Sequence, residues 1–285
     1  MVRLSLLFSL LILGISPAVS AMKPPSLGGV LNRATDELAG PSFLVVHGPI
    51  KLTLRTIDAD VDVMTGNADV VSARVSGGDG AKVQLSAEGG DRVEISFDGA
   101  PTLRSGRLGI TVPVHSAVEI ATTAGSIAVT GTAGQVRART ASGDVRVERA
   151  QSCELGSISG AVDLREATDA RVDTVSGHTT VESVPVLRYS SSSGDLSWSG
   201  PCGAGCRLEA RTLSGKVAVR IAQPGSFELR YQTEDGKLDD QIHLERDTRA
   251  RASGRLQRIR ARIGAAEGLV EVQTWHGDLA LLRLP

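Results

Sequence analysis

The stretch Thr140–Val147 reads TASGDVRV, and close copies of it recur along the chain, each anchored on a glycine. The first three steps between the aligned glycines are 18, 17 and 17 residues long. A period of this size predicts a solenoid, in which each coil buries its apolar face only by stacking on its neighbours. The glycines that we align as structural turn residues are Gly125, Gly143, Gly160, Gly177, Gly194, Gly215, Gly236 and Gly277.

Apolar residues stand at fixed distances from these glycines. Around Gly143 they are Val136, Ala138, Val145 and Val147, which lie seven and five residues before it and two and four after it. This alternation has a period of two, which indicates strands rather than helices. We therefore expect two short strands per coil, a turn at the glycine with φ above zero, and parallel pairing between successive coils.

Two further columns accompany the apolar ones. Three residues before each glycine stands Thr or Ser, as at Thr140, with the same parity as the apolar positions. We expect these hydroxyls to point inward and to be satisfied by hydrogen bonds, as a structural ladder. Six residues before each glycine the residues are charged, as at Arg137 and Glu154, which is typical of a solvated face with salt bridges.

The fold class that these patterns predict is all-β, a parallel β-solenoid of about nine coils with a less regular N-terminal β cap. We assign residues 43–115 to the irregular N-terminal part, where Ala59 takes the glycine position of a degenerate coil. Residues 116–238 hold the regular glycine coils, 239–268 an Arg-rich insertion and 269–285 a final coil. The cap would cover strand edges that a stack leaves exposed.

The first residues have the pattern of a secretory signal peptide. Arg3 precedes the apolar run Leu4–Ile15, and small residues end at Ala21, so we predict cleavage after residue 21 and a leader over 22–42. The protein is then expected to be exported, as a periplasmic, outer-membrane-associated or secreted protein, without a transmembrane segment in the mature chain. The 31 basic and 32 acidic residues are balanced, which does not favour nucleic acid as a partner.

The insertion contains the candidate binding residues Arg255, Arg258, Arg260 and Arg262. The last three alternate along the chain, which predicts one more strand with a basic outer face. One interpretation is a contact for an anionic envelope surface or polysaccharide. The other is a solvated surface balanced by neighbouring acidic residues.

Cysteine and histidine give little support for metal or cofactor chemistry. Cys202 and Cys206 flank a short loop, and in an oxidising compartment they are expected to form a disulfide. Cys153 occupies an apolar column and is expected to be buried. No metal site, cofactor or catalytic residue is predicted; Asp163 and Glu182 are acidic candidates only by default, as paired carboxylates would be needed for glycoside chemistry.

The repeated Ser-Gly-Asp-Val motif resembles the bacterial putative-adhesin family of β-strand-repeat proteins, over roughly Phe43 to Leu284. The resemblance implies a surface or envelope role and supplies no catalytic residues. We therefore expect a non-catalytic, adhesin-like or scaffolding protein whose ligand is an unidentified envelope polysaccharide, lipid head group or protein. The alternatives are a polysaccharide-active enzyme and an envelope-stress protein that binds another protein.

Overall fold

The computed structural model describes residues 41–66, 69–77, 81–89, 91–97, 103–131, 133–223, 225–246 and 256–284, all within the compact unit Ala39–Pro285. These residues form strands and turns and contain no helix, so the all-β prediction is confirmed. The predicted signal peptide, and the leader up to residue 40, lie outside the described residues.

The strands of the described residues belong to one hydrogen-bonded sheet. In chain order they are β1 (Ser42–Val45), β2 (Lys51–Gly66), β3 (Val70–Ser76), β4 (Val83–Glu88), β5 (Arg92–Phe97), β6 (Leu103–Pro113), β7 (Ala117–Ala121), β8 (Ile127–Thr130), β9 (Ala133–Thr140), β10 (Val145–Ser157), β11 (Val162–Thr174), β12 (His178–Glu182), β13 (Val186–Ser191), β14 (Asp195–Pro201), β15 (Arg207–Thr212), β16 (Val217–Ala222), β17 (Phe227–Thr233), β18 (Leu238–Asp240), β19 (Glu245–Arg246), β20 (Gln257–Ile263), β21 (Gly268–Thr274) and β22 (Leu279–Arg283).

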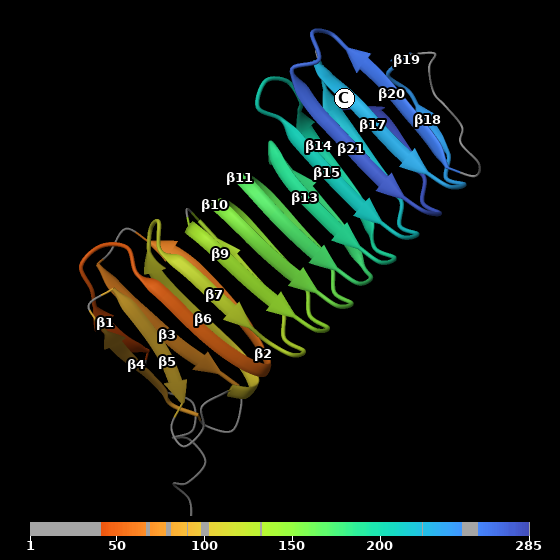
Figure 1. Ribbon diagram of the computed structural model, residues 1–285. Coiled ribbons are helices and arrows are strands. Elements are labelled where there is room, and N and C mark those ends of the chain that lie inside the picture. The colour runs from red at the N-terminus through yellow and green to blue at the C-terminus, as the bar shows by residue number, and fades with distance from the viewer. Residues whose placement is uncertain are drawn as a thin grey trace, which may run out of the picture. The chain divides into compact units, whose positions relative to one another are not determined.

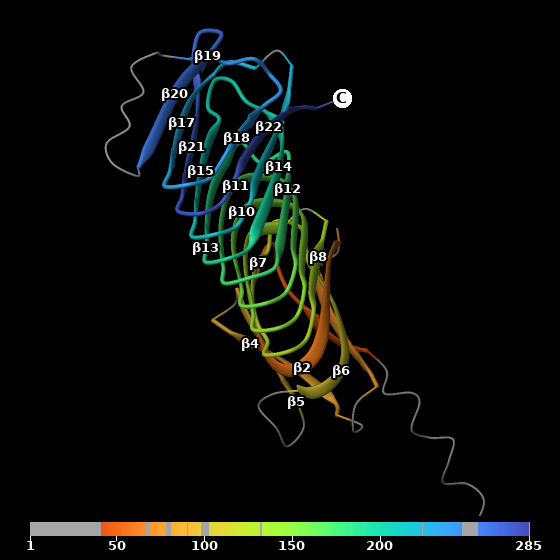
Figure 2. The same cartoon turned by 90° about the vertical axis from the view of Figure 1, so that its right-hand side faces the viewer.

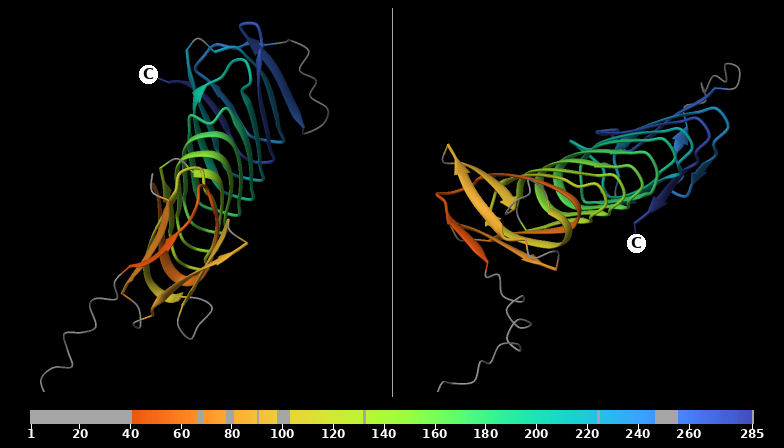
Figure 3. Two further views of the ribbon diagram at one scale, coloured as in Figure 1. Left: turned by 90° about the vertical axis from the view of Figure 1, so that its left-hand side faces the viewer. Right: turned by 90° about the horizontal axis from the view of Figure 1, so that it is seen from below.

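Successive repeats pair in parallel, one repeat apart (Figure 1). We call each repeat a coil and name it by its aligned glycine. Val145 of β10 lies opposite Val162 of β11, which in turn lies opposite Thr179 of β12. The wall before the glycine turn follows the same rule through β9, β10, β11, β13 and β15. Figure 3 shows the turns of these coils aligned from coil to coil.

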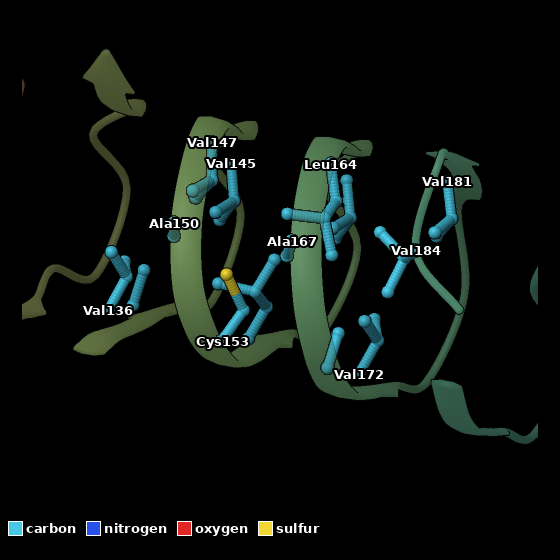
Figure 4. Close-up of a cluster of buried hydrophobic side chains, with 14 of the residues drawn as sticks. Val136, Val145, Val147, Ala150, Cys153, Leu164, Ala167, Val172, Val181 and Val184 are labelled. Atoms are coloured by element: carbon cyan, nitrogen blue, oxygen red, sulfur yellow. The ribbon is translucent and has the colours of Figure 1, made fainter. Parts of the chain in front are cut away.

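The core fills the narrow space inside the coils. Val136, Val145, Val147 and Val172 are fully buried, as the alternation predicts. In Figure 4 the labelled side chains from the facing walls of each coil point toward one another. Cys153 occupies one of these inward positions, and burial raises the pKa of its thiol to about 12. Small aliphatic side chains therefore supply most of the burial in this part of the chain.

The aligned glycines are explained by close packing rather than by their backbone angles, which corrects our expectation. Only Gly177 among them has a positive φ, of +107°. In most of the others a Cβ would lie 1.8–2.0 Å from the carbonyl oxygen of the coil below, a distance that no side chain tolerates. The pairs are Gly125 on Ala59, Gly143 on Gly125, Gly160 on Gly143, Gly215 on Gly194, Gly277 on Gly215 and Gly236 on Gly277.

The inward hydroxyl column satisfies the N–H group of all the aligned glycines except Gly177. Thr140 Oγ1 accepts the N–H of Gly143 at 3.0 Å and donates to the carbonyl oxygen of Gly125 at 3.3 Å. The glycine hydrogen bond recurs at Thr122, Ser157, Ser191, Thr212, Thr233 and Thr274. The predicted structural ladder is thus present, and the buried hydroxyls offset their desolvation through these bonds. Thr56 and Thr174 are exceptions, because their hydroxyls have no partner among the described residues.

The aspartate that follows several glycines joins one coil to the next. Asp144 Oδ1 accepts the N–H of Ala161 at 2.8 Å, and Asp195 Oδ1 accepts the N–H of Lys216 at 2.8 Å. Asp60 and Asp278 make the equivalent bonds to Ser126 and Lys237. The Ser-Gly-Asp motif therefore combines a turn, a close approach and a carboxylate that caps an N–H group of the neighbouring coil.

The order of the coils in space differs from their order in the sequence at the C-terminal end. β21 pairs in parallel with β15 on one side and β17 on the other, and β22 lies between β16 and β18. The predicted final coil is therefore inserted between the Gly215 and Gly236 coils. Figure 2 shows β15, β21, β17 and β20 following one another in that order.

The N-terminal end shows the same arrangement. β2 pairs with β7 and β8 on one side and with β5 and β6 on the other, all in parallel. The part predicted to be irregular thus contains coil strands as well as a cap, and Ala59 stands at the glycine position as expected. Antiparallel strands cover the outer strands at both ends: β3 on β6, β4 on β5 and β20 on β17.

A disulfide between Cys202 and Cys206 closes the loop between β14 and β15, with 5.1 Å between the two Cα atoms. The loop also organises the inserted coil. The carbonyl oxygen of Cys202 accepts the N–H of Ser226, and that of Cys206 accepts the N–H of Leu269. Because these residues precede β17 and begin β21, the loop holds both strands at their starting points.

Replacing Gly160 with Ala tests the packing role of the glycines. The new Cβ would stand 1.8 Å from the carbonyl oxygen of Gly143, so we expect Gly160→Ala to lower the free energy of unfolding by about 3 kcal/mol or more. Urea denaturation measures the change. Gly203→Ala is the matched control, because a Cβ there meets nothing within 4 Å. Equal midpoints for the two variants would remove the packing explanation.

Hydrogen exchange tests the inserted position of β21. We expect its amides to exchange as slowly as those of β15 and about tenfold or more slower than those of β20, because β21 has a paired strand on each side. Exchange measured by NMR or by mass spectrometry of peptides resolves the three strands. Exchange of β21 as fast as that of β20 would instead place this coil at the end of the stack.

Candidate functional site

The candidate site is a hollow of about 270 Å³ on the outer face of β17, β20 and β21. We call it the basic hollow. Its lining residues are Arg230, Tyr231, Gln232, Arg258, Ile259, Arg260, Glu271, Val272 and Gln273. Figure 2 shows the three strands side by side at the C-terminal end of the stack. The hollow is therefore formed where the inserted coil and the covering strand meet.

Strand register brings the polar lining residues together. Arg230 lies opposite Arg260 in the antiparallel pair of β17 and β20, and Gln232 lies opposite Arg258. On the other side of β17, Glu271 and Gln273 of β21 lie opposite the same two residues. Side chains alternate along a strand, so these positions share the outer face. Three guanidinium groups, two amide groups and the carboxylate of Glu271 are thus arranged in two rows across three strands.

The acidic groups at the hollow are held by neighbouring side chains. Arg230 Nε donates to Glu228 Oε1 at 2.9 Å, and Gln273 Nε2 donates to Glu271 Oε1 at 2.7 Å. The hydrogen bond from Arg230 lowers the pKa of Glu228, helped by the charges of Arg230, Arg262 and Arg260. Among the described residues, Arg258 and Arg260 form no ion pair with a carboxylate.

Beneath these polar groups the floor of the hollow is the backbone of the strands, whose remaining side chains turn toward the core. Tyr231 and Val272 are buried inward-facing residues, and Ile259 is half-buried. The hydroxyl of Tyr231 donates to the carbonyl oxygen of Gly277 at 3.1 Å, and burial raises the pKa of this phenol. The floor is therefore fixed by the core, while the guanidinium groups stand in solvent above it.

Two of the four predicted basic residues line the hollow. Arg258 and Arg260 lie on β20, within the strand that the alternation predicts, and both line the hollow. Arg262 is exposed on the same strand, opposite Glu228, and is not part of the lining. Arg255 lies outside the described residues.

Sequence reasoning missed Arg230, Gln232, Glu271 and Gln273. They occupy the columns six and four residues before their glycines, which were visible in the alignment. The alignment could not show which residues lie next to them on adjacent strands, because the order of the coils in the sequence places Arg230 beside Glu209. In the structure Glu209 lies opposite Glu271, and Glu271 lies opposite Arg230. The inserted coil therefore changes the charge pattern at this end of the stack.

The default acidic candidates, Asp163 and Glu182, share one arginine. Arg165 Nε lies 3.3 Å from Asp163 Oδ1 and 3.7 Å from Glu182 Oε2, and Arg146 also pairs with Asp163. This is an ion-pair network on the outer face of the stack, with a cation held between the two carboxylates. Ion pairs of this kind at the surface contribute little to stability, about 0–1 kcal/mol each.

Two features are absent from the part of the chain that the structure describes. No group of three or more His, Cys, Asp and Glu side chains is arranged to hold a metal ion in this part of the chain. Nor do the described ranges include a helix of the length and apolar character needed to cross a bilayer.

Comparisons with known proteins identify the family. A family model described as Toastrack DUF4097 matches residues 50–282. The chain is also similar to a solved structure described as a putative adhesin from Bacteroides fragilis, with 11% identity and a TM-score of 0.46, over 85% of this chain and 96% of that one. Another similar structure, described as a putative cell adhesion protein from Clostridium sporogenes, has 12% identity and a TM-score of 0.24, over 86% and 99% of the two chains. No curated protein matches the chain.

The family model covers all eight aligned glycines and every strand from β2 to β21. It confirms the resemblance that the Ser-Gly-Asp-Val repeats indicate, and the chain belongs to the Toastrack DUF4097 family.

Proposed function

We propose that this protein is a non-catalytic, exported, adhesin-like β-solenoid that binds an anionic ligand of the bacterial envelope through the basic hollow. The observation that carries the proposal is the convergence of Arg230, Arg258 and Arg260 from two strands onto one face. Guanidinium groups bind carboxylate, phosphate and sulfate groups through paired hydrogen bonds, which are stronger than those between neutral groups.

The charge at the hollow supports an anionic ligand. Glu228 is paired with the guanidinium of Arg230, whereas Glu271 accepts a hydrogen bond from the neutral amide of Gln273 and keeps its negative charge. Many arginines of the outer faces stand in ion pairs, such as Arg137 with Glu154 and Arg188 with Glu209, and Arg230 of the hollow pairs with Glu228. Within the described residues, Arg258 and Arg260 lack such a pair and remain available for an external anion.

The backbone under the hollow is suited to binding without rearrangement. β17 is paired along its length with β20 and β21, and its inward side chains are packed in the core. A site on paired strands loses less conformational entropy on binding than a site on a loop. This favours recognition or scaffolding, in which a rigid stack presents side chains at fixed spacing.

Export is part of the proposal. The predicted signal peptide supports it, and so does the disulfide between Cys202 and Cys206, because disulfides persist in oxidising compartments such as the periplasm and the cell exterior. The periplasm, the outer membrane and the medium all remain consistent with these two features.

A second candidate function is the binding of another envelope protein. Ile158, Val175 and Leu213 are exposed apolar residues in one column, two positions before their glycines. Exposed apolar surface of this kind occurs at protein–protein contacts. These residues lie on coils distinct from the strands that form the hollow.

Replacing both free arginines tests the proposed function. We expect Arg258→Gln with Arg260→Gln to weaken binding of the purified protein to lipopolysaccharide or acidic polysaccharide by at least about tenfold, because charge-assisted hydrogen bonds are lost. Binding should also weaken between low and physiological salt. Biolayer interferometry on immobilised ligands measures both effects.

The matched control removes two arginines from another part of the same outer face, as Arg171→Gln with Arg188→Gln. Equal loss of binding in the two double variants would mean that net charge, and not the basic hollow, attracts the ligand. Shortening of the polysaccharide during the assay would contradict the non-catalytic proposal and favour an enzyme. If neither lipopolysaccharide nor acidic polysaccharide bound, a pull-down from envelope extract would test the protein-binding candidate, with Ile158→Asp as its control.

A further inference from the structure

Trp275 stands beside the basic hollow with its side chain in solvent. Its side chain is 56% exposed, and it follows Gln273, a lining residue, by two positions along the chain. Trp275 lies on the bend that follows the end of β21 at Thr274, and two residues of chain span at most about 7 Å. The other tryptophan of the chain, Trp198, is fully buried and donates its indole N–H to the carbonyl oxygen of Val184. One tryptophan therefore belongs to the core, and the other lies at the surface.

The backbone of Trp275 is fixed although its side chain is exposed. Its N–H donates to the carbonyl oxygen of Leu213 at 3.2 Å. Its carbonyl oxygen accepts the N–H groups of Glu234 and Asp235, at 3.1 and 3.3 Å, and the hydroxyl of Thr233 at 3.3 Å. Neighbouring coils thus hold this residue from both sides, so that the ring is presented from a rigid position.

We propose that the ligand of the basic hollow is an acidic saccharide, in which a sugar ring stacks on Trp275 while its acidic substituent pairs with Arg258 and Arg260. This inference rests on the proposed function and names its ligand class. Each part of such a ligand has a matching group: an aromatic face for the ring, guanidinium groups for the acid, and the amides of Gln232 and Gln273 for hydroxyls.

The chemistry of these groups favours a sugar over other anions. The face of an indole is electron-rich and attracts the C–H groups that line one face of a pyranose. An amide side chain both donates and accepts hydrogen bonds, as a sugar hydroxyl does. A bare phosphate or a peptide carboxylate would pair with the arginines but would make no stacking contact with the exposed ring.

The size of the hollow indicates a segment of a polymer. Its volume of about 270 Å³ is slightly below the roughly 300–1,000 Å³ that is usual for pockets enclosing a whole small molecule. A site of this size receives one or two units of a longer chain, whose remaining units continue along the outer face.

Trp275 also supplies the readout. Because Trp198 is fully buried, iodide should quench mainly the fluorescence of Trp275. We expect polygalacturonate, a polymer of acidic sugars, to reduce this quenching and to bind the full mature protein. Poly-glutamate, which carries carboxylates without sugar rings, should bind about tenfold more weakly and leave the quenching unchanged. Dextran, which has sugar rings without charge, should show no measurable binding.

Variants separate the ring from the charge. Trp275→Ala should weaken polygalacturonate binding about five- to tenfold and leave poly-glutamate binding unchanged, whereas Trp275→Phe should retain part of the affinity. Ile158→Ala is the matched control, because it removes an exposed apolar side chain from the same column on a distant coil. Thermal melting of each variant checks that the fold is retained.

The outcomes distinguish the two proposals. Equal binding of polygalacturonate and poly-glutamate, unchanged in Trp275→Ala, would overturn the saccharide inference and leave the anion-binding function in place. Binding of neither polyanion, with the quenching unaltered, would overturn both. Loss of poly-glutamate binding in Trp275→Ala would show that the variant disturbs the arginines; Trp275→Phe binding polygalacturonate no better than Trp275→Ala would then overturn the role of the ring.

Discussion

The contact on which this structure depends is the approach of each glycine to the carbonyl oxygen of the coil below. A Cβ at Gly160 would stand 1.8 Å from that oxygen, so any side chain would force the coils apart. The same glycine donates its N–H to Ser157, whose hydroxyl is buried beneath the turn. Close stacking, the inward hydroxyl and the glycine are therefore one requirement, which explains why the hydroxyl residue and the glycine recur together, three positions apart.

That requirement is shared by most of the coils, which is why it cannot specify their order. The Gly277 coil meets the glycine contact between Gly215 and Gly236 as well as it would at the end of the stack. What determines its place is outside the repeat: the disulfide loop receives Leu269 and Ser226, and β20 covers the outer edge of β17. Similar columns make neighbours interchangeable, so local chemistry at the loop decides between them.

The sequence was therefore informative about local and repeated features, and uninformative about which strands become neighbours outside the repeat. The period predicts the strands, the parallel register and the buried hydroxyl of Thr140, and the alternation predicts the strand that carries Arg258. It gave the wrong reason for the glycines, because a positive φ and a close backbone approach both select glycine, and the sequence does not distinguish the two causes. It also could not place Arg230 beside Arg260, since this contact depends on the antiparallel return of β20 along β17, which the repeat does not predict.

The difference between the regular coils and the C-terminal end also indicates where a ligand binds most easily. In the regular coils many outer charges have a partner in the same or the neighbouring coil, as Arg171 has Asp173 and Arg137 has Glu154. A ligand would have to displace those partners. At the C-terminal end the inserted coil brings Glu271 rather than Glu209 beside Arg230, and the covering strand adds arginines that the repeat did not provide. The departure from the repeat thus closes the edge of the stack and, with the same residues, creates a charged surface that the regular coils do not have.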